Sequence, residues 1–314
     1  MSHRSISHVL TVGITTRNRP DALAACLASL QVIAHLDPEV LVFDDASDPP
    51  VQANAAVIRD AASPGYIVGR NRLVREASGE FVLLMDDDAR LIGAAAVDDA
   101  IAVLRQDPGV GAVAFAQAEA DGRPWPAAMQ PSAAQVPSFV PSFIGFAHMI
   151  RRDRFLALGG YREAFGFYGE EKEFCLRLLD AGVHTIYLPH ALVAHVVDPN
   201  SRDRTRYLRF VARNDCLNSL LNDPLTRLAW MLPARYALYF RMRRGWQIQD
   251  PWGGLWLLRE IAARLPDVWK ARRPVSRDTL KEWSSLKNEQ RAYHGSGARD
   301  QASVSLQPDG VGGR

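Results

Sequence analysis

Three adjacent carboxylates, Asp86, Asp87 and Asp88, directly follow the apolar run Phe81–Met85, whose length and composition indicate a buried strand. Like charges at the end of a buried strand raise its free energy unless a cation lies among them. In parallel α/β sheets, ligands bind just beyond the carboxyl ends of the strands, which is where this triplet falls. Carboxylate oxygens suit Mg²⁺ or Mn²⁺, and one or two of them form a normal site together with a substrate diphosphate. The triplet therefore predicts a divalent-metal site, against the alternative of a solvated acidic turn that leads into a helix.

A second acidic cluster, Asp44-Asp45-Ala46-Ser47, holds the same relative place after the predicted strand Glu39–Asp44. We expect the two clusters to converge on one crevice of one sheet. A carboxylate there can accept a hydrogen bond from a nucleobase N–H or a ribose hydroxyl. The alternative is an ordinary turn, in which Asp and Ser are common.

A third acidic pair, Glu170 and Glu171, begins a helix predicted over Glu170–Ala181. Adjacent helical residues point about 100° apart, so the two carboxylates cannot share one task. Glu171 aligns with Cys175 and Leu178 on the inward stripe, whereas Glu170 falls on a mixed face. An inward carboxylate at a helix start is placed like a general base, although acidic residues there are also ordinary helix caps.

His195 ends the apolar run Leu192–His195 and is either a ligand or a structural histidine. Other signatures of chemistry are absent from the sequence. Gly65 and Gly69 do not form a dinucleotide fingerprint, and neither a Lys-bearing phosphate loop nor a Gly-x-Ser-x-Gly elbow is present.

Predicted strands and helices alternate along the first half of the chain, and these elements must position the side chains described above. Strands are predicted at Val9–Thr15, Glu39–Asp44, near Tyr66, Glu80–Met85 and Gly111–Ala116, with helices after Pro20 and across Val97–Leu104. This alternation predicts a largely parallel sheet covered on both faces. Residues 117–142 hold five prolines and indicate a substrate-shaping insertion, after which regular structure resumes at Phe143–Ile150. The last strands are expected at His184–Leu188 and Leu192–Val197.

Composition places the chain among ordinary soluble globular proteins. It has 314 residues, 47% apolar and 23% charged, which excludes disorder, collagen and coiled coil as descriptions of the whole. No apolar run approaches the roughly 20 residues needed to cross a bilayer, and the N-terminus has no signal-peptide core. Three cysteines without metal-site spacing fit a reducing compartment, so a cytoplasmic location is expected.

The charged residues behind the net charge of +2 are distributed unevenly along the chain. Residues 1–201 carry 16 basic and 24 acidic side chains, whereas residues 202–275 carry 15 basic and 6 acidic ones. Residues 1–201 therefore form a poor surface for nucleic acid, and residues 202–275 are a candidate binding region for an anionic partner. The basic segment also holds five of the seven tryptophans, a mixture that suits the surface of an anionic membrane. The alternative is that the arginines of the basic segment pair with the acidic residues of 1–201.

A set of short segments, taken in chain order, resembles the family 2 glycosyltransferases. The matching segments are Val12-Gly-Ile-Thr-Thr-Arg-Asn18, Val42-Phe-Asp-Asp-Ala-Ser47, Gly69-Arg-Asn71, Leu84-Met-Asp-Asp-Asp88, Gly159-Gly-Tyr161, Tyr168-Gly-Glu-Glu171, Pro189 through His195, and Arg213-Asn214. The resemblance implies a GT-A fold, which is an α/β fold with a mixed, mostly parallel sheet between helices, here with a helical C-terminal extension. The implied catalytic domain covers residues 8–215, with a nucleotide-sugar half at about 8–116 and an acceptor half at about 143–200. Residues 216–293 form the helical basic region, and 294–314 are expected to be a disordered tail.

The resemblance also implies a role for each matching residue. Glu171 would be the catalytic base, with Glu170 beside it in the catalytic motif. Donor binding would fall to Thr15, Asn18, Asp44, Arg70, Asp86 and Asp87, with Thr15 and Asp44 at the nucleobase. Asp88 would hold the metal, joined by Asp86 and His195. The base motif departs from the usual Glu-Asp by one methylene, and the first motif lacks the aromatic residue that often stacks near the nucleobase.

The activity so implied is inverting transfer of a sugar from a nucleotide-diphosphate sugar to a glycan or lipid-linked acceptor, assisted by Mn²⁺ or Mg²⁺. In such a reaction the metal neutralises the leaving diphosphate while Glu171 removes the proton of the acceptor hydroxyl. The alternatives are a sugar nucleotidyltransferase and a nucleotide-sugar-binding scaffold that has lost catalysis. No nucleic-acid partner is expected, and contact with the inner face of the plasma membrane is a further expectation.

Overall fold

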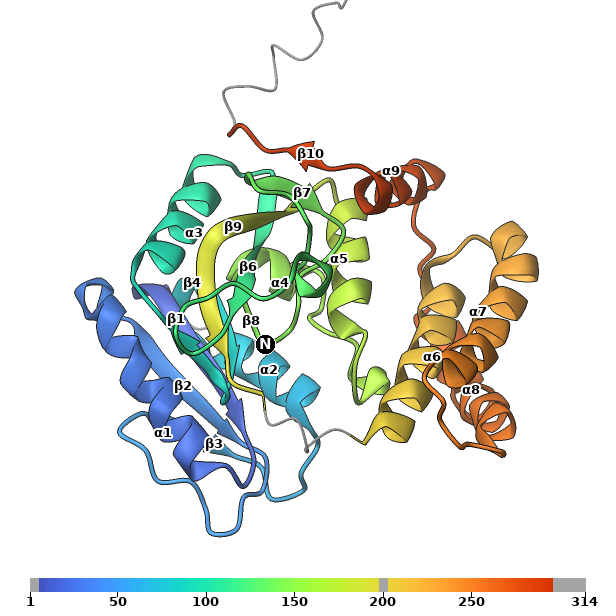
Figure 1. Cartoon of the computed structure of the whole chain (residues 1–314), viewed down its shortest axis with the longest axis horizontal. Coiled ribbons are helices and arrows are strands. Elements are labelled where there is room, and N and C mark those ends of the chain that lie inside the picture. The colour runs from blue at the N-terminus through green and yellow to red at the C-terminus, as the bar shows by residue number, and fades with distance from the viewer. Residues whose placement is uncertain (1–5, 198–202, 296–314) are drawn as a thin grey trace, which may run out of the picture.

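The computed structural model describes residues 6–197 and 203–295, which form one mixed sheet covered by helices (Figure 1). The sheet has ten strands. In spatial order they are β10 (Arg291–Ala292), β7 (Ser138–Val140), β9 (His184–His195), β6 (Val110–Ala118), β8 (Ala147–Arg151), β4 (Gly79–Asp86), β1 (His8–Thr16), β2 (Glu39–Asp44) and β3 (Ala56–Arg59), with β5 (Ala89–Leu91) paired to β9. Strands β4, β1, β2 and β3 are parallel, whereas β8 runs antiparallel between β4 and β6.

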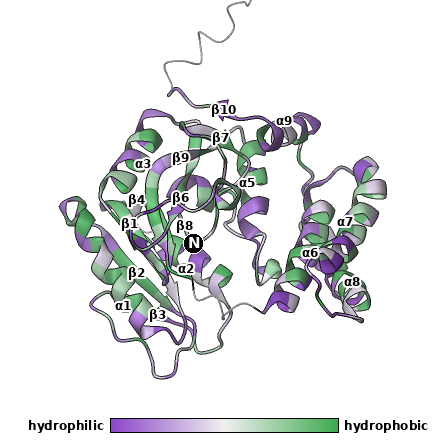
Figure 2. Ribbon diagram, viewed as in Figure 1, coloured by the Kyte–Doolittle hydropathy of each residue, from purple (hydrophilic) through white to green (hydrophobic). Residues whose placement is uncertain are grey.

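Alternation of side chains along the central strands builds two cores, one on each face of the sheet. From β1 and β4, residues such as Val12 and Leu83 face a core that is covered by α1 (Pro20–Ser29), η1 (Leu30–Leu36) and α3 (Ala95–Gln106). The opposite residues, such as Leu84, face a core covered by α2 (Tyr66–Glu76), α4 (Arg152–Ala157) and α5 (Glu170–Asp180). Because both faces are buried, the middle of each of these strands is rich in apolar residues, such as Phe81–Met85 of β4 (Figure 2).

Several predicted elements differ from the structure. The strand expected near Tyr66 is wrong, because α2 begins there and the strand lies earlier, at β3. The two last strands expected on either side of Pro189 are one strand, β9. Within the insertion, the described elements are η2 (Ala127–Met129) and β7, which adds to the sheet edge.

The C-terminal region is helical, as predicted. It consists of α6 (Arg204–Asn222), α7 (Leu225–Gly245), α8 (Gly253–Ala271) and α9 (Arg277–Asn288), followed by β10. The boundary predicted at residue 215 falls inside α6, which lies between the sheet and the α7–α8 pair (Figure 1). Most of the predicted tail, residues 296–314, lies outside the described residues. None of the helices described is both long and apolar enough to cross a bilayer.

Candidate active site

A cleft with a volume of about 1060 Å³ lies at the carboxyl ends of β1 and β4. Strand register explains why the acidic clusters meet there. Thr15 of β1 is in register with Asp86 of β4, and Thr16 is in register with Asp44 of β2. The ends of three parallel strands therefore open on one edge, as the sequence predicted.

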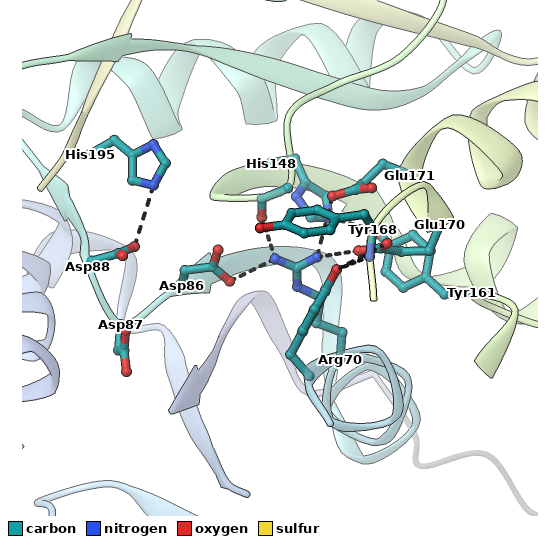
Figure 3. Close-up of polar contacts among 12 residues, drawn as sticks. Arg70, Asp86, Asp87, Asp88, His148, Tyr161, Tyr168, Glu170, Glu171 and His195 are labelled. Atoms are coloured by element: carbon teal, nitrogen blue, oxygen red, sulfur yellow. Dashed lines mark hydrogen bonds and ion pairs between the residues drawn. The ribbon is translucent and has the colours of Figure 1, made fainter. Parts of the chain in front are cut away.

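Asp86 lies at the cleft and is paired with Arg70 from α2 (Figure 3). Nη2 of Arg70 donates to Asp86 Oδ1 at 2.7 Å and to the carbonyl of Gly145 at 2.7 Å. Its Nη1 donates to Glu170 Oε1 at 3.0 Å and lies 3.8 Å from Glu171 Oε1. The buried guanidinium thus connects the strand-end carboxylate with the start of α5, two groups more than 80 residues apart in sequence.

Asp87 points away from its two neighbours (Figure 3). Its carboxylate accepts hydrogen bonds from Thr16 Oγ1 at 2.7 Å and from Arg19 Nη1 at 2.6 Å. Burial raises the pKa of Asp87 to about 6, although Thr16 and Arg19 act against that shift. Repulsion within the triplet is therefore relieved by separating the side chains and by supplying two arginines, Arg19 and Arg70.

Asp88 faces His195 across the cleft. Its Oδ2 accepts from Arg19 at 3.1 Å, whereas the buried Oδ1 has no hydrogen-bond partner within the described residues. That oxygen lies 3.6 Å from His195 Nε2. One carboxylate oxygen and one ring nitrogen are thus aimed at each other without a direct hydrogen bond.

His195 is held in a defined orientation. Its Nδ1 lies 2.7 Å from Oε1 of Gln117, which can only accept, so Nδ1 carries a proton and Nε2 is turned toward Asp88. The ring is stacked on Phe146 at 4.7 Å and on Trp125 at 5.4 Å. The ring is therefore fixed with Nε2 facing Asp88, a position compatible with the predicted ligand role.

The two glutamates of α5 are separated by burial. Glu171 lines the cleft, and 17% of its side chain is exposed. Glu170 was predicted to fall on a mixed face, and that prediction is wrong. Its side chain is fully buried and accepts hydrogen bonds from Arg70 and, at 3.2 Å, from Tyr66 Oη.

Electrostatics distinguish the two glutamates further. Burial raises the pKa of Glu170 well above its usual range, and the neighbouring Glu171 charge adds to that shift. Burial also raises the pKa of Glu171, while the Arg70 charge opposes the increase. Glu171 is therefore a carboxylate at the cleft with more affinity for a proton than an exposed glutamate has.

The other predicted donor residues are divided between the cleft and the loops behind it. Thr15, Arg70, Asp86 and Asp87 line the cleft, whereas Asn18 and Asp44 are not among the described residues that line it. Asp44 is buried and pairs with Arg59, and the hydrogen bonds it receives outweigh burial and lower its pKa. Asn18 joins two loops, since its backbone N–H donates to Ser47 Oγ and its side chain accepts from the Asp48 N–H.

Several residues of the cleft were missed by the sequence reasoning. They are Thr16, Arg19, Tyr66, Gln117, Trp125, Tyr168, Arg206 and Phe210. Thr16 is the last residue of β1 and Arg19 follows the strand, within or next to the first matching segment, so their place at the end of a strand was an available signal. Trp125 lies in the insertion and Arg206 in α6, and only the tertiary fold brings them to the cleft.

The pair Arg213-Asn214 supports the loop that precedes Glu171. Asn214 Nδ2 lies 2.7 Å from the carbonyl of Phe167 and 2.6 Å from that of Tyr168. Arg213 donates to the Phe165 carbonyl and, at 3.1 Å, to Glu260 of α8. The C-terminal helices thereby position the start of α5.

Comparison with known proteins identifies relatives of one kind. The model of a family described as "Glycosyl transferase family 2" matches residues 11–157. An N-acetylglucosaminyltransferase of Sinorhizobium fredii is 31% identical over 247 residues, covering 66% of this chain and 58% of the relative. An N-acetylglucosaminyltransferase of Bradyrhizobium diazoefficiens is 29% identical, covering 68% of this chain and 48% of the relative. The chain thus spans about half the length of these relatives.

Solved structures with the same fold are more distant in sequence. A mannosyltransferase from Pyrobaculum calidifontis, in complex with GDP-Man and Mn²⁺, is 16% identical with a TM-score of 0.50, covering 91% of this chain and 86% of that one. TarS residues 1–349 of S. aureus, in complex with UDP, is 18% identical with a TM-score of 0.55, covering 89% of this chain and 87% of that one. These likenesses confirm the predicted α/β fold of the GT-A type, with its helical C-terminal region.

Proposed function

Because the chain belongs to glycosyl transferase family 2, we propose that it moves a sugar from a nucleotide-diphosphate sugar to a hydroxyl group of a glycan or lipid-linked acceptor. One observation carries this proposal. The Glu171 carboxylate and the facing pair Asp88 and His195 line the same cleft, so a candidate proton acceptor and two candidate metal ligands face one substrate volume. The complexes of fold relatives with UDP, or with GDP-Man and Mn²⁺, support a donor of this class.

The residues at the strand end fit a divalent cation. The fit rests on Asp88 Oδ1, which is buried without a hydrogen-bond partner among the described residues, and on His195 Nε2, which lies 3.6 Å from it. Asp88 and His195 would hold the ion, with Asp86 as a third candidate that already pairs with Arg70. Among the described residues, no group of three or more acidic, His or Cys side chains is arranged to hold a metal, so donor phosphates would complete the site. The bound ion would neutralise charge on the leaving diphosphate.

Glu171 is proposed as the general base. Its carboxylate would take the proton of the acceptor hydroxyl while that oxygen forms a bond to the anomeric carbon. The bond from the anomeric carbon to the diphosphate breaks on the opposite face with its electron pair, so the anomeric configuration inverts. The raised pKa of Glu171 suits this role, because a carboxylate with greater proton affinity is the stronger base.

Arg70 and Glu170 are proposed as positioning residues rather than as donor ligands. The guanidinium is buried, and its nitrogens already donate to Asp86, Glu170 and the Gly145 carbonyl. It is therefore placed to fix carboxylates around the cleft. The motif residue Glu170 would act through Arg70, since it is enclosed below the cleft surface.

The alternatives of nucleotidyl transfer and of an inactive scaffold have less support. The matched family is one of glycosyl transfer, and the base position holds a carboxylate. A lipid-linked acceptor would be met at the inner face of the plasma membrane, which extends the cytoplasmic location expected from the sequence.

The proposal is tested first by donor binding and turnover. A panel of UDP-, GDP- and dTDP-sugars with Mn²⁺ is screened by thermal shift, because a ligand of the native state raises the melting temperature. Hydrolysis or transfer of the best donor is then measured for the wild type, Glu171→Gln and Glu170→Gln. We expect Glu171→Gln to bind the donor but to lose about 10²- to 10⁴-fold in turnover. Glu170→Gln should mainly lower the melting temperature, because it weakens a buried ion pair.

Two results would contradict the proposal. Binding without turnover for every donor would indicate a scaffold. Full activity of Glu171→Gln together with a folded but inactive Glu170→Gln would exchange the two roles.

A further inference from the structure

Large apolar side chains are unusually exposed on α7, α8 and their flanks. Eight such residues between 225 and 269 are at least 40% exposed, against six at 36% or more in the rest of the described molecule. The eight are Leu225, Trp230, Phe240, Trp252, Leu255, Leu258, Leu265 and Trp269. A concentration of exposed apolar side chains in one part of a molecule makes that part a candidate interaction site.

Helix α8 carries apolar residues on its buried face and on the exposed surface beside it. Its inner face presents Leu257 and Val268, which are buried against the rest of the protein. Its outer face presents Leu255, Leu258 and Leu265 at spacings close to one or two helical turns. The residues of the outer face are not covered by any other described part of the protein, so they present apolar surface to a partner.

Helix α7 has the same property. Met231 and Tyr239 are buried, whereas Trp230, Ala237 and Phe240 lie on exposed positions. The two helices lie next to each other on the side of α6 away from the sheet (Figure 1), and apolar residues recur along both (Figure 2). Their outer faces, with Leu225 and Trp252 at the flanks, are called the outer apolar surface below.

Charge identifies what would cover the outer apolar surface. The acidic residues Asp250 and Glu260 are paired with arginines of the same region, Arg209 for the first and Arg213 and Arg264 for the second. The exposed side chains of Arg241, Arg244, Arg259 and Lys270 form no ion pair with any residue that the structure describes. Against these four cations, Asp267 is the one exposed acid between residues 225 and 271.

The ion pairs bear on the expectation that these arginines pair with acids of residues 1–201. Among the described residues, the arginines of this region that form ion pairs use acids of the C-terminal helices or their ends, such as Asp215, Asp223 and Asp250, rather than acids of residues 1–201. The positive charge of the outer face is therefore not cancelled by the catalytic part of the molecule.

We propose that the outer apolar surface docks on an anionic lipid bilayer, with its tryptophans and leucines at the headgroup boundary and its arginines on lipid phosphates. Exposed Trp rings beside Arg side chains suit that boundary, where one end of the residue is apolar and the other is wet. A second copy of this chain would bring four unpaired cations against four others, which disfavours self-association. The proposal concerns binding alone and does not rest on glycosyl transfer.

The test is co-sedimentation of the full-length protein with vesicles. Phosphatidylcholine vesicles are compared with vesicles that contain 30% phosphatidylglycerol, at low and high salt, and Trp emission is recorded in parallel. We expect binding to the anionic vesicles, with a blue shift of emission, and loss of binding as salt rises. The double variant Arg241→Gln/Arg244→Gln should bind roughly 25-fold more weakly, at about fivefold per cation.

Matched variants test whether vesicle binding depends on the outer apolar surface or on exposed residues anywhere in the protein. Trp252→Ser/Leu255→Ser/Trp269→Ser should keep the wild-type melting temperature, since all three side chains are more than half exposed, and should lose vesicle binding. Arg105→Gln and Val32→Ser change exposed residues of α3 and η1 and should bind as the wild type does. Absence of binding at low salt, equal binding by the triple variant, or a dimer that dissociates in the triple variant would each overturn the proposal.

Discussion

The backbone of Gly145 is pressed against the carboxylate of Glu171. A Cβ atom built on Gly145 would lie 2.1 Å from Glu171 Oε1 and 2.9 Å from Arg70 Nη1. Contacts this short do not occur, so a side chain at residue 145 would have to displace the ends of the Glu171 and Arg70 side chains from their present positions. The Gly145 carbonyl in turn accepts a hydrogen bond from Arg70 at 2.7 Å. One glycine therefore sets the positions of both the carboxylate and its cation.

Gly145→Ala should lower turnover about 10²-fold, because the added methyl group displaces the Glu171 carboxylate from its place on the cleft. Donor affinity should change less than turnover, since the metal and phosphate side of the cleft is untouched. The measurement is the kcat and KM of donor turnover together with the melting temperature. Gly93→Ala is the matched control, because nothing lies within 4 Å of its Cβ position. Equal activity of the two variants would show that the position of the carboxylate does not matter.

The pH dependence of turnover follows from the shifted pKa of Glu171. The base must be ionised, and burial raises its pKa above the ordinary 4.5, so activity should fall with decreasing pH at a value above that of a normal glutamate. The Arg70 charge lowers the pKa of Glu171, so Arg70→Gln should move this fall to still higher pH. Activity of the variant would then be reduced more at pH 6 than at pH 9. The measurement is kcat/KM for the donor from pH 5 to 9.

Arg70→Lys is the control, because it keeps a positive charge near Glu171 and should leave the pH profile close to that of the wild type. Arg70→Gln should also reduce the free energy of unfolding by about 3–5 kcal/mol, since Glu170 stays buried without its cation. An unshifted profile in a folded Arg70→Gln protein would exclude Glu171 as the group that titrates.

Much of this site could be predicted because local sequence determines which residues end each strand. The apolar runs placed Asp86 and Asp44 after strands, and the parallel register of β4, β1 and β2 then brings those strand ends together. The helix start at Glu170 and its stop at Gly182, where φ is +73°, follow from residue type alone.

The parts of the fold and site that could not be predicted depend on contacts between residues that are distant in the sequence. Periodicity assigned Glu170 to a mixed face, but Arg70, 100 residues earlier, makes its complete burial possible. The strand expected at Tyr66 failed for a related reason, because the helix there packs through Gly69 on Phe43 of β2. The stacking of Trp125 on His195 joins the insertion to the sheet, and no local pattern encodes that contact.

Removal of the metal should abolish donor turnover, and Asp88 should determine how tightly the metal returns. Asp88→Asn replaces the oxygen that has no hydrogen-bond partner near His195 Nε2, so Mn²⁺ affinity in the presence of the nucleotide should fall at least tenfold. Mn²⁺ binding is measured by electron paramagnetic resonance, independently of turnover, and turnover is then followed during titration of chelator-treated protein. Asp87→Asn is the control: its carboxylate is already taken by Thr16 and Arg19, so the change should affect the melting temperature more than Mn²⁺ affinity. Full turnover in excess chelator, or weaker Mn²⁺ binding in Asp87→Asn than in Asp88→Asn, would place the cation elsewhere.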